Sequence, residues 1–470
     1  MIILILLVAA GHTLNAQAHV HPAGDTGQRF IQNFSFRDYN AYSENWDIVQ
    51  DRQGIIYAAN GKGILAYDGV SWRLTESESV YSLAVDENGV VYVSMYGDFG
   101  YLEAEASGQT RFVSLLDKSS GEYDNLLGRR LLARPEGIYC ASREFILRWS
   151  PRGLRKWHPK SWFGSIFFLH QQIYVYAGEV GLMRLENDSL QLAPGGEFFA
   201  DAGVSVMLPS EIDGDTTAIL IGTHSRGLFL YDGSSIRPFP AAVNDFLKDN
   251  ELSCGVQLRD RTYLLGTQRG GAVRIDRRGN ILEILNEAGG IRNDEVQAIY
   301  PDRQGGLWLA LYDGISRVEL PSRWSFFDEA SGIQSDVSAV QRHRGGLYLI
   351  GRFGRYRGIY SLSPKSMVPE QNGQISQFGF SHLADIKTNA WALLSAGKDL
   401  LAATDEGVYQ IRDSKATLLP GNRVYTQSLC RSQQDSNRVY VGLGDGLAVL
   451  ERVRGQWISR GRLAETDAEV

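Results

Sequence analysis

A repeated unit of about 43 residues constrains the fold of this chain more than any other sequence feature. In its clearest copy, residues 46–72, short apolar segments alternate with tight turns that contain Gly, Asn or Asp, which is the pattern of β-hairpins. Residues 296–327 repeat this order of segments and turns. One aromatic or leucine residue anchors each of ten copies: Tyr57, Tyr92, Tyr139, Tyr174, Leu220, Leu264, Trp308, Tyr348, Leu401 and Tyr440.

These units predict an all-β fold, a β-propeller. A four-stranded sheet of this length leaves both faces apolar and must pack between two similar sheets. The segment 30–34 reads as a strand without a unit of its own, and propellers often close by pairing such a strand with the last blade. We therefore predict one closed seven-bladed ring over residues 30–320, then the first three blades of a second, incomplete propeller over residues 321–463. A single ten-bladed ring is the alternative, and only residues 241–249 have a helical pattern.

The two ends of the chain carry no repeat. Residues 1–10 are almost wholly apolar, and Ala16-Gln17-Ala18 fits a signal-peptidase site, so residues 1–18 are predicted to be a signal peptide. The apolar run is about half of the ~20 residues that a membrane span needs. We therefore expect an exported, periplasmic chain with a polar tail at 464–470. A net charge of -7 without a basic cluster argues against nucleic acid as a partner.

The sequence predicts no metal site and no cofactor. The three cysteines, Cys140, Cys254 and Cys430, are far apart and form no CxxC pair, and Cys140 is expected to be a buried small thiol. The eight histidines form no HExxH pattern. Asp213 and Asp215 lack the further oxygen ligands of a calcium loop, which favours a hairpin tip.

Aspartates recur in the first turn of several units, at Asp51, Asp86 and Asp302. Such carboxylates could form the acid–base set of a glycosidase. Each, however, opens an Asp-x-x-Gly turn, in which the side chain bonds the local backbone. We therefore interpret these aspartates as turn formers and predict no catalytic residues.

The candidate ligand site lies on the turns between the second and third strands of each unit, which crowd one mouth of a propeller ring. Their polar residues differ from blade to blade, which suits a ligand seat on a rigid scaffold, although solvated turns would look the same. The candidates, with two tryptophans that begin nearby inner strands, are Trp46, Asn60, Lys62, Tyr96, Asp98, Arg143, Glu144, Trp162, Glu179, His224, Arg226, Gln268, Arg269, Tyr312 and Asp313. The expected ligand is small, a carbohydrate or a peptide.

Several units resemble the two-component-regulator propeller repeat. The best copies are IVQDRQGIIYAANGKGILAYDG (48–69) and IYPDRQGGLWLALYDGISRV (299–318), and residues 219–233 and 263–276 match its second half. The third and fourth units lack the Trp and Gly-Thr of the repeat.

In proteins of this family, two such propellers form the extracytoplasmic sensor of a bacterial receptor. A triple-tyrosine domain, a membrane helix and a cytoplasmic effector follow. The resemblance implies a non-enzymatic, ligand-sensing fragment that reaches the membrane only through parts downstream of it. A homodimer through the propellers remains open. The alternatives are an exported polysaccharide lyase or glycosidase and a secreted interaction scaffold.

Overall fold

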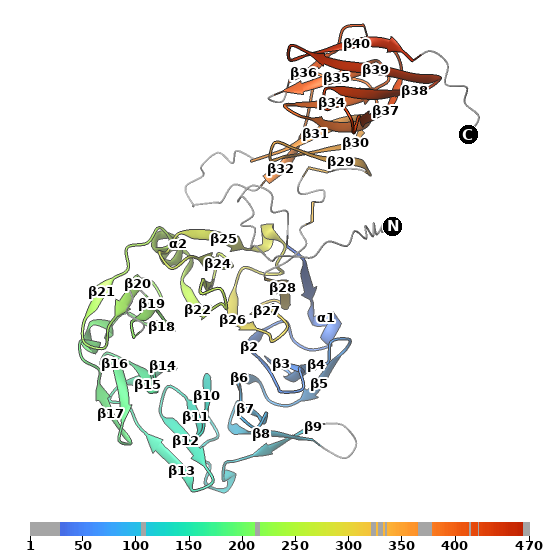
Figure 1. Ribbon diagram of the computed structural model, residues 1–470. Helices are drawn as coiled ribbons and strands as arrows, with labels where there is room; N and C mark the ends of the chain where they lie inside the picture. Colours follow the sequence, from blue (N-terminus) through green and yellow to red (C-terminus); the bar gives the residue numbers. More distant parts are fainter. Residues whose placement is uncertain are drawn as a thin grey trace. The chain divides into compact units, whose positions relative to one another are not determined.

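The computed structural model describes residues 29–104, 110–211, 217–320, 326–327, 332–333, 336–364, 378–412, 415–421 and 423–463 (Figure 1). The predicted signal peptide, the polar tail and the pair Asp213 and Asp215 lie outside these residues. The described residues fall into two compact units, an N-terminal unit (29–320) and a C-terminal unit (326–463). Ten four-stranded antiparallel sheets fill the two units, so the all-β architecture predicted from the repeat is confirmed.

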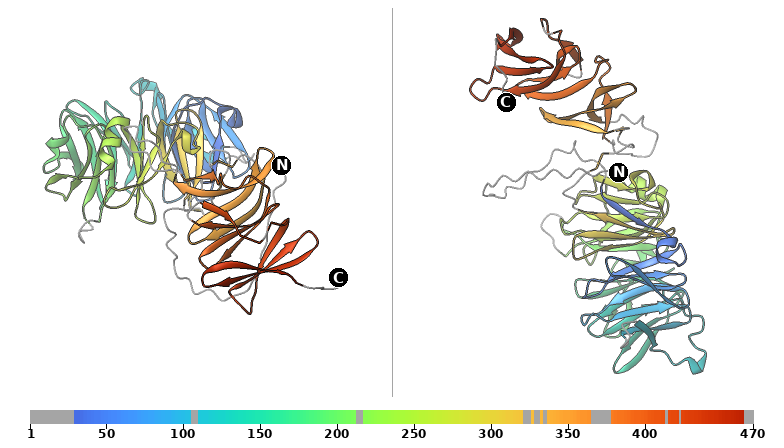
Figure 2. Two further views of the ribbon diagram at one scale, coloured as in Figure 1. Left: turned by 90° about the horizontal axis from the view of Figure 1, so that it is seen from above. Right: turned by 90° about the vertical axis from the view of Figure 1, so that its right-hand side faces the viewer.

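The N-terminal unit contains seven of these sheets, numbered here in chain order, and Figure 2 shows them from two further directions. Sheet 1 consists of β2 (Asn45–Gln50), β3 (Ile56–Asn60), β4 (Gly63–Tyr67) and β5 (Trp72–Glu76). Sheet 2 consists of β6 (Val80–Val85), β7 (Val91–Met95), β8 (Asp98–Ala104) and β9 (Thr110–Ser114). Sheet 3 consists of β10 (Arg130–Arg134), β11 (Gly137–Ala141), β12 (Ile146–Ser150) and β13 (Gly153–Trp157). Sheet 4 consists of β14 (Trp162–Leu169), β15 (Gln172–Gly178), β16 (Gly181–Glu186) and β17 (Ser189–Leu192). Sheet 5 consists of β18 (Val204–Pro209), β19 (Ile219–Thr223), β20 (Gly227–Tyr231) and β21 (Ile236–Pro238). Sheet 6 consists of β22 (Leu252–Gln257), β23 (Tyr263–Thr267), β24 (Ala272–Ile275) and β25 (Ile281–Leu285).

Sheet 7 joins the two ends of the N-terminal unit. It consists of β26 (Val296–Pro301), β27 (Gly306–Leu311), β28 (Ile315–Glu319) and, as its outermost strand, β1 (Ile31–Phe34). β1 runs antiparallel to β28 with Phe34 opposite Ile315, which is the pairing expected from the sequence. The contacts between the first strands of the sheets are cyclic: β2 contacts β6, and contacts continue through β10, β14, β18 and β22 to β26, which contacts β2.

The C-terminal unit contains three sheets. They are β29 (Val337–His343), β30 (Gly346–Phe353), β31 (Tyr356–Pro364) and β32 (Phe378–His382); β33 (Ala390–Ala396), β34 (Asp399–Thr404), β35 (Gly407–Arg412) and β36 (Lys415–Leu418); and β37 (Thr426–Arg431), β38 (Arg438–Leu443), β39 (Gly446–Val453) and β40 (Gln456–Arg462). All ten anchor residues of the repeat, in both units, lie on the second strand of their sheet.

Helices are few and short in the described part of the chain. α2 (Val243–Asn250) occupies the predicted helical segment, and α1 (Phe36–Tyr39) follows β1. Three 3₁₀ turns complete the set: η1 (Lys118–Ser120), η2 (Gly196–Phe199) and η3 (Glu287–Gly289).

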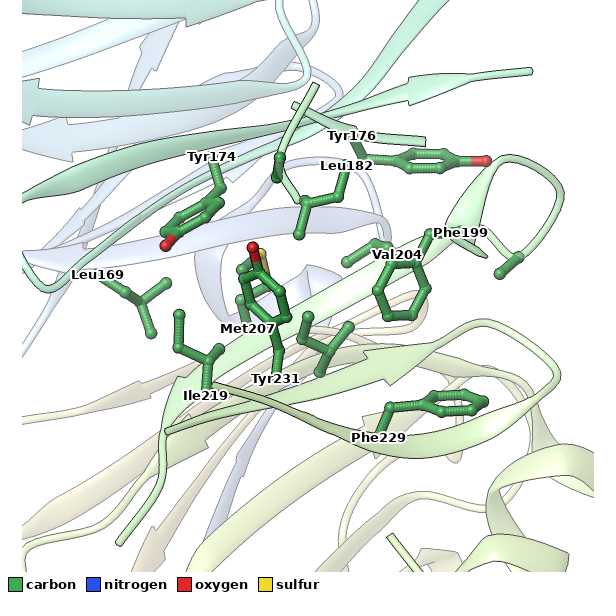
Figure 3. Packing of buried hydrophobic residues seen from close by; sticks show 13 residues of the cluster. Leu169, Tyr174, Tyr176, Leu182, Phe199, Val204, Met207, Ile219, Phe229 and Tyr231 are labelled. Atoms are coloured by element: carbon green, nitrogen blue, oxygen red, sulfur yellow. The ribbon is translucent and has the colours of Figure 1, made fainter. Parts of the chain in front are cut away.

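The core lies between the faces of neighbouring sheets. The second strands β3, β7, β11, β19 and β23 are buried at every position, because each is covered on both faces. Figure 3 shows the packing of sheet 4 on sheet 5, with Tyr174, Tyr176 and Leu182 facing Ile219, Phe229 and Tyr231. No single sheet could bury this surface alone, which explains why the sequence repeats the unit.

The recurrent aspartates close turns, as predicted. Asp51 Oδ1 accepts the Ile55 N–H at 2.9 Å, and Asp302 Oδ1 accepts the Gly306 N–H at 2.6 Å. Asp86 accepts the Val90 N–H in the same way at 2.9 Å. These carboxylates therefore bond the backbone of their own hairpins.

Candidate functional site

The predicted site residues lie where the repeat placed them, on the turns between second and third strands or next to them. Two of them are buried, and their prediction as ligand contacts is wrong. Asn60 is 0% exposed: its Nδ2 donates to the Tyr42 and Glu44 carbonyls, and its Oδ1 accepts the Lys62 N–H. Asp98 is 4% exposed and accepts hydrogen bonds from the Ser114 hydroxyl and the Phe99 N–H. The polar groups of both side chains are therefore engaged in hydrogen bonds within the fold.

Most of the charged candidates form local ion pairs. The pairs are Lys62 with Glu76 at 2.9 Å, Arg226 with Asp201 at 2.8 Å, Asp313 with Arg292 at 3.1 Å, and Arg269 with Glu251. The charges of these four candidates are therefore balanced at short range. The His224 ring lies next to the same Glu251, with its Nε2 at 3.6 Å. Tyr96 and Tyr312 are exposed, as are Glu144, Glu179 and Gln268.

Two candidates, Arg143 and Trp162, meet in a pocket of about 290 Å³ between sheets 3 and 4. We call it the Trp162 pocket, and it is lined by Arg129, Arg130, Ser142, Arg143, Trp162, Phe163, Gly164 and Ser165. The Arg143 guanidinium lies over the Trp162 ring, with its carbon 4.9 Å from the ring centre. The Phe163 N–H donates to the Arg143 carbonyl at 2.9 Å, which ties the turn that carries Arg143 to β14. Glu144, the next residue of this turn, does not line the pocket.

The position of Trp162 is set by a bulge and by two glycines. The pairing of β14 with β15 shifts register between Phe163 and Ile166, so that Gly164 and Ser165 face the pocket without regular partners. Gly178 lies opposite Trp162, and a Cβ on it would lie 2.0 Å from the indole ring. The edge of Tyr176 supports the indole, with ring centres 5.6 Å apart. The ring therefore has little freedom to move.

A Gly178→Ala substitution is expected to lower the free energy of unfolding by about 1–3 kcal/mol, because its methyl group would overlap the indole of Trp162. Urea unfolding followed by tryptophan fluorescence measures this. In a Trp162→Ala background the same change should cost much less, because the overlap is gone. An equal cost in both backgrounds would contradict the placement of the ring.

Arg130 connects the pocket electrostatically to other sheets. Burial raises the pKa of Asp47 on β2 above its ordinary value of 3.8, and the Arg130 guanidinium acts in the opposite direction. The same guanidinium acts on Cys254 of β22.

The carboxylate of Asp47 is occupied by its own neighbours. It accepts the Ser82 hydroxyl at 2.7 Å and the Leu83 N–H at 3.0 Å, and the Ser82 hydroxyl oxygen accepts the Leu131 N–H at 2.9 Å. This buried chain joins sheets 1, 2 and 3. Asp47 is therefore part of the scaffold that joins these three sheets.

Arg129, Arg130 and Ser142 line the pocket but were not predicted from the sequence. Ser142 lies on the turn between β11 and β12, where candidates were expected, whereas Arg129 and Arg130 stand at the start of a first strand. Trp46 and Trp162 were noticed at that same position of their units. The signal in the sequence was the pair of consecutive arginines, Arg129 and Arg130, at the start of the first strand of the third unit.

The cysteines are separate, and two are chemically protected. Burial raises the pKa of the Cys140 thiol to about 12 and that of Cys254 to about 11, whereas Cys430 is exposed. In the described part of the chain, no group of three or more His, Cys, Asp or Glu side chains could hold a metal ion.

We therefore expect Ellman's reagent to modify one thiol per native chain, that of Cys430, and all three after unfolding in guanidinium. A Cys430→Ser chain should show no fast reaction in the native state. Rapid native labelling of this variant would show that Cys140 or Cys254 is accessible.

The repeat and the fold both match known proteins. Residues 290–313 match the family model described as two component regulator propeller. Among curated proteins, none matches this sequence. The fold is similar to the extracellular domain of the hybrid two component system BT3049 from B. thetaiotaomicron, with a TM-score of 0.62 and 15% identity over 94% of this chain. The extracellular domain of BT4673 from the same organism gives 0.50, with 17% identity over 93% of this chain.

The family model identifies a two-component regulator propeller repeat at residues 290–313, and the structural likeness confirms the predicted propeller fold. At such low identities, the structural likeness speaks for the fold alone. The chain spans 61% of the length of each of these two extracellular domains. Within the described residues, no helix has the length and apolar character needed to cross a membrane.

Proposed function

We propose that this chain is the ligand-sensing, extracytoplasmic region of a bacterial signal-transduction receptor and has no catalytic activity of its own. The observation that carries the proposal is the Trp162 pocket, a small cavity with arginine and tryptophan side chains on a propeller of the regulator type. The similarity to extracellular domains of two-component systems supports it. The recurrent aspartates support a non-enzymatic role, because they serve their own turns.

The domain layout forms part of this proposal. Sheets 1 to 7 would be one closed ring, and the three sheets of the C-terminal unit would begin a second propeller. Export by a signal peptide at residues 1–18 would place both in the periplasm. Because the sheets of a propeller are stiff, a bound ligand would act by rigid-body rearrangement between propellers or between protomers.

The test is the sequence of the gene beyond the codon for Val470. The proposal predicts an open reading frame with further propeller repeats, then a membrane-spanning segment and a cytoplasmic effector domain. A stop codon directly after Val470 would overturn the receptor assignment and would favour a secreted binding module.

A further inference from the structure

The Trp162 pocket concentrates positive charge, and of its arginines Arg130 interacts beyond ion-pair distance with the buried Asp47 carboxylate. Three of its lining residues, Arg129, Arg130 and Arg143, are arginines. Within the described residues, no carboxylate lies within ion-pair distance of any of these three guanidinium groups, and none of the groups donates a hydrogen bond to the protein.

Several other arginines of the N-terminal unit pair with carboxylates. Arg148 and Arg155 of sheet 3 both bond Asp188, at 3.0 and 2.7 Å, and Arg274 of sheet 6 bonds Asp260 at 2.5 Å. The chain as a whole is acidic, with a net charge of -7. Three guanidinium groups without an ion pair around one cavity therefore mark a place for an anion.

The pocket also holds one guanidinium in place before a ligand arrives. Arg143 stacks on Trp162, and the indole is fixed by Tyr176 and by the absence of a side chain at Gly178. A stacked guanidinium keeps its N–H groups free at its edge, where they match the two oxygens of a carboxylate or other oxoanion. Fixing the group in advance lowers the entropy that binding must overcome.

The volume limits the size of the ligand. A cavity of about 290 Å³ lies at the lower end of the ~300–1,000 Å³ typical of small-molecule sites, which suits one sugar ring or a small organic acid. We propose that the Trp162 pocket binds a monosaccharide-sized ligand through one oxoanion group, a carboxylate, phosphate or sulfate. The role of this ligand as the sensed signal rests on the proposed function, whereas its binding does not.

Calorimetry on the whole chain with four compounds that share one ring tests the proposal: glucose, glucuronate, glucose 6-phosphate and glucose 6-sulfate. At least one anion should bind about tenfold or more tightly than glucose, and its affinity should fall as salt increases. Which anion binds best identifies the oxoanion. If none of the three binds more tightly than glucose, the proposal is overturned.

Arginine variants test whether the anion binds in the Trp162 pocket. Arg143→Gln and Arg129→Gln change exposed side chains, and each should weaken binding of the preferred anion about tenfold or more. Arg152→Gln is the matched control, because Arg152 is an exposed arginine on the turn between β12 and β13 of the same sheet and does not line the pocket. Equal affinities in all variants, or an equal loss in the control, would refute the assignment.

The failures of the two proposals are distinguishable. Anion binding by a chain whose gene stops after Val470 would keep the pocket assignment and remove the receptor. A gene that continues into a membrane span and an effector, with no anion binding by the chain, would keep the receptor assignment and remove the pocket assignment.

Discussion

Phe34→Ala is expected to lower the free energy of unfolding of the N-terminal unit by about 3–5 kcal/mol, the largest effect of any single substitution considered. Phe34 is 7% exposed and lies at the end of β1. Its ring stacks on Trp308 of β27 with centres 5.8 Å apart. It also contacts Tyr67 and Trp72 of sheet 1 at 5.2 and 5.3 Å. One side chain therefore packs sheet 7, the last sheet of the N-terminal unit, against sheet 1.

Hydrogen exchange followed by mass spectrometry is the appropriate measurement, because it reports each unit separately. Exchange should accelerate in peptides of sheets 1 and 7 and remain unchanged in the C-terminal unit. The matched control is Phe36→Ala, two residues away and 42% exposed, which should change stability by about 0.5 kcal/mol or less. A loss below about 1 kcal/mol for Phe34→Ala would show that β1 does not hold the unit closed.

Asp399→Ala should destabilise the C-terminal unit by about 3 kcal/mol. Asp399 is 0% exposed, and its Oδ1 accepts a hydrogen bond from Arg412 at 2.6 Å. Its Oδ2 accepts the Trp457 Nε1–H at 2.9 Å and lies 3.3 Å from Arg452. The carboxylate thereby joins two sheets, and its removal leaves the buried Trp457 Nε1–H without an acceptor.

This effect should depend on pH. Burial raises the pKa of Asp399, but the hydrogen bonds from Arg412 and Trp457 prevail and hold it below its ordinary value of 3.8. A lowered pKa in the folded state stabilises the fold above the ordinary value, and this stabilisation disappears as the pH falls through the folded-state value. The difference between the wild-type chain and Asp399→Ala should therefore be full at pH 7 and shrink below about pH 4.

Hydrogen exchange at pH 7 measures the first effect, with Asp445→Ala as the control. Asp445 pairs with Arg462 at 3.0 Å in the same unit, but both side chains are more than half exposed, so its loss should cost about 1 kcal/mol or less. Equal costs for the two variants would contradict the buried role of Asp399.

The repeat allowed the strands to be predicted well, because turn chemistry and alternation act locally. Every anchor residue falls on a second strand, and the aspartates at 51, 86 and 302 form the turns expected of them. α1 was missed, since four residues are too few to show a helical period.

The candidate site was predicted less well, because burial and partners depend on segments distant in the sequence. In the sequence, Asn60 and Asp98 are polar residues of a turn, as are Lys62 and Tyr96. In the fold, however, the segment before β2 encloses Asn60, and Ser114 and Lys118 enclose Asp98. Arg143 and Trp162 share a pocket because sheets 3 and 4 meet there. Their spacing in the sequence gives no sign of this contact.

A crystal structure of the chain grown with the anion that binds best would decide whether the Trp162 pocket holds a ligand. We expect the sugar between sheets 3 and 4, with its oxoanion group within hydrogen-bond distance of at least two of Arg129, Arg130 and Arg143. The same anion bound elsewhere on the chain, with this pocket empty, would refute the assignment.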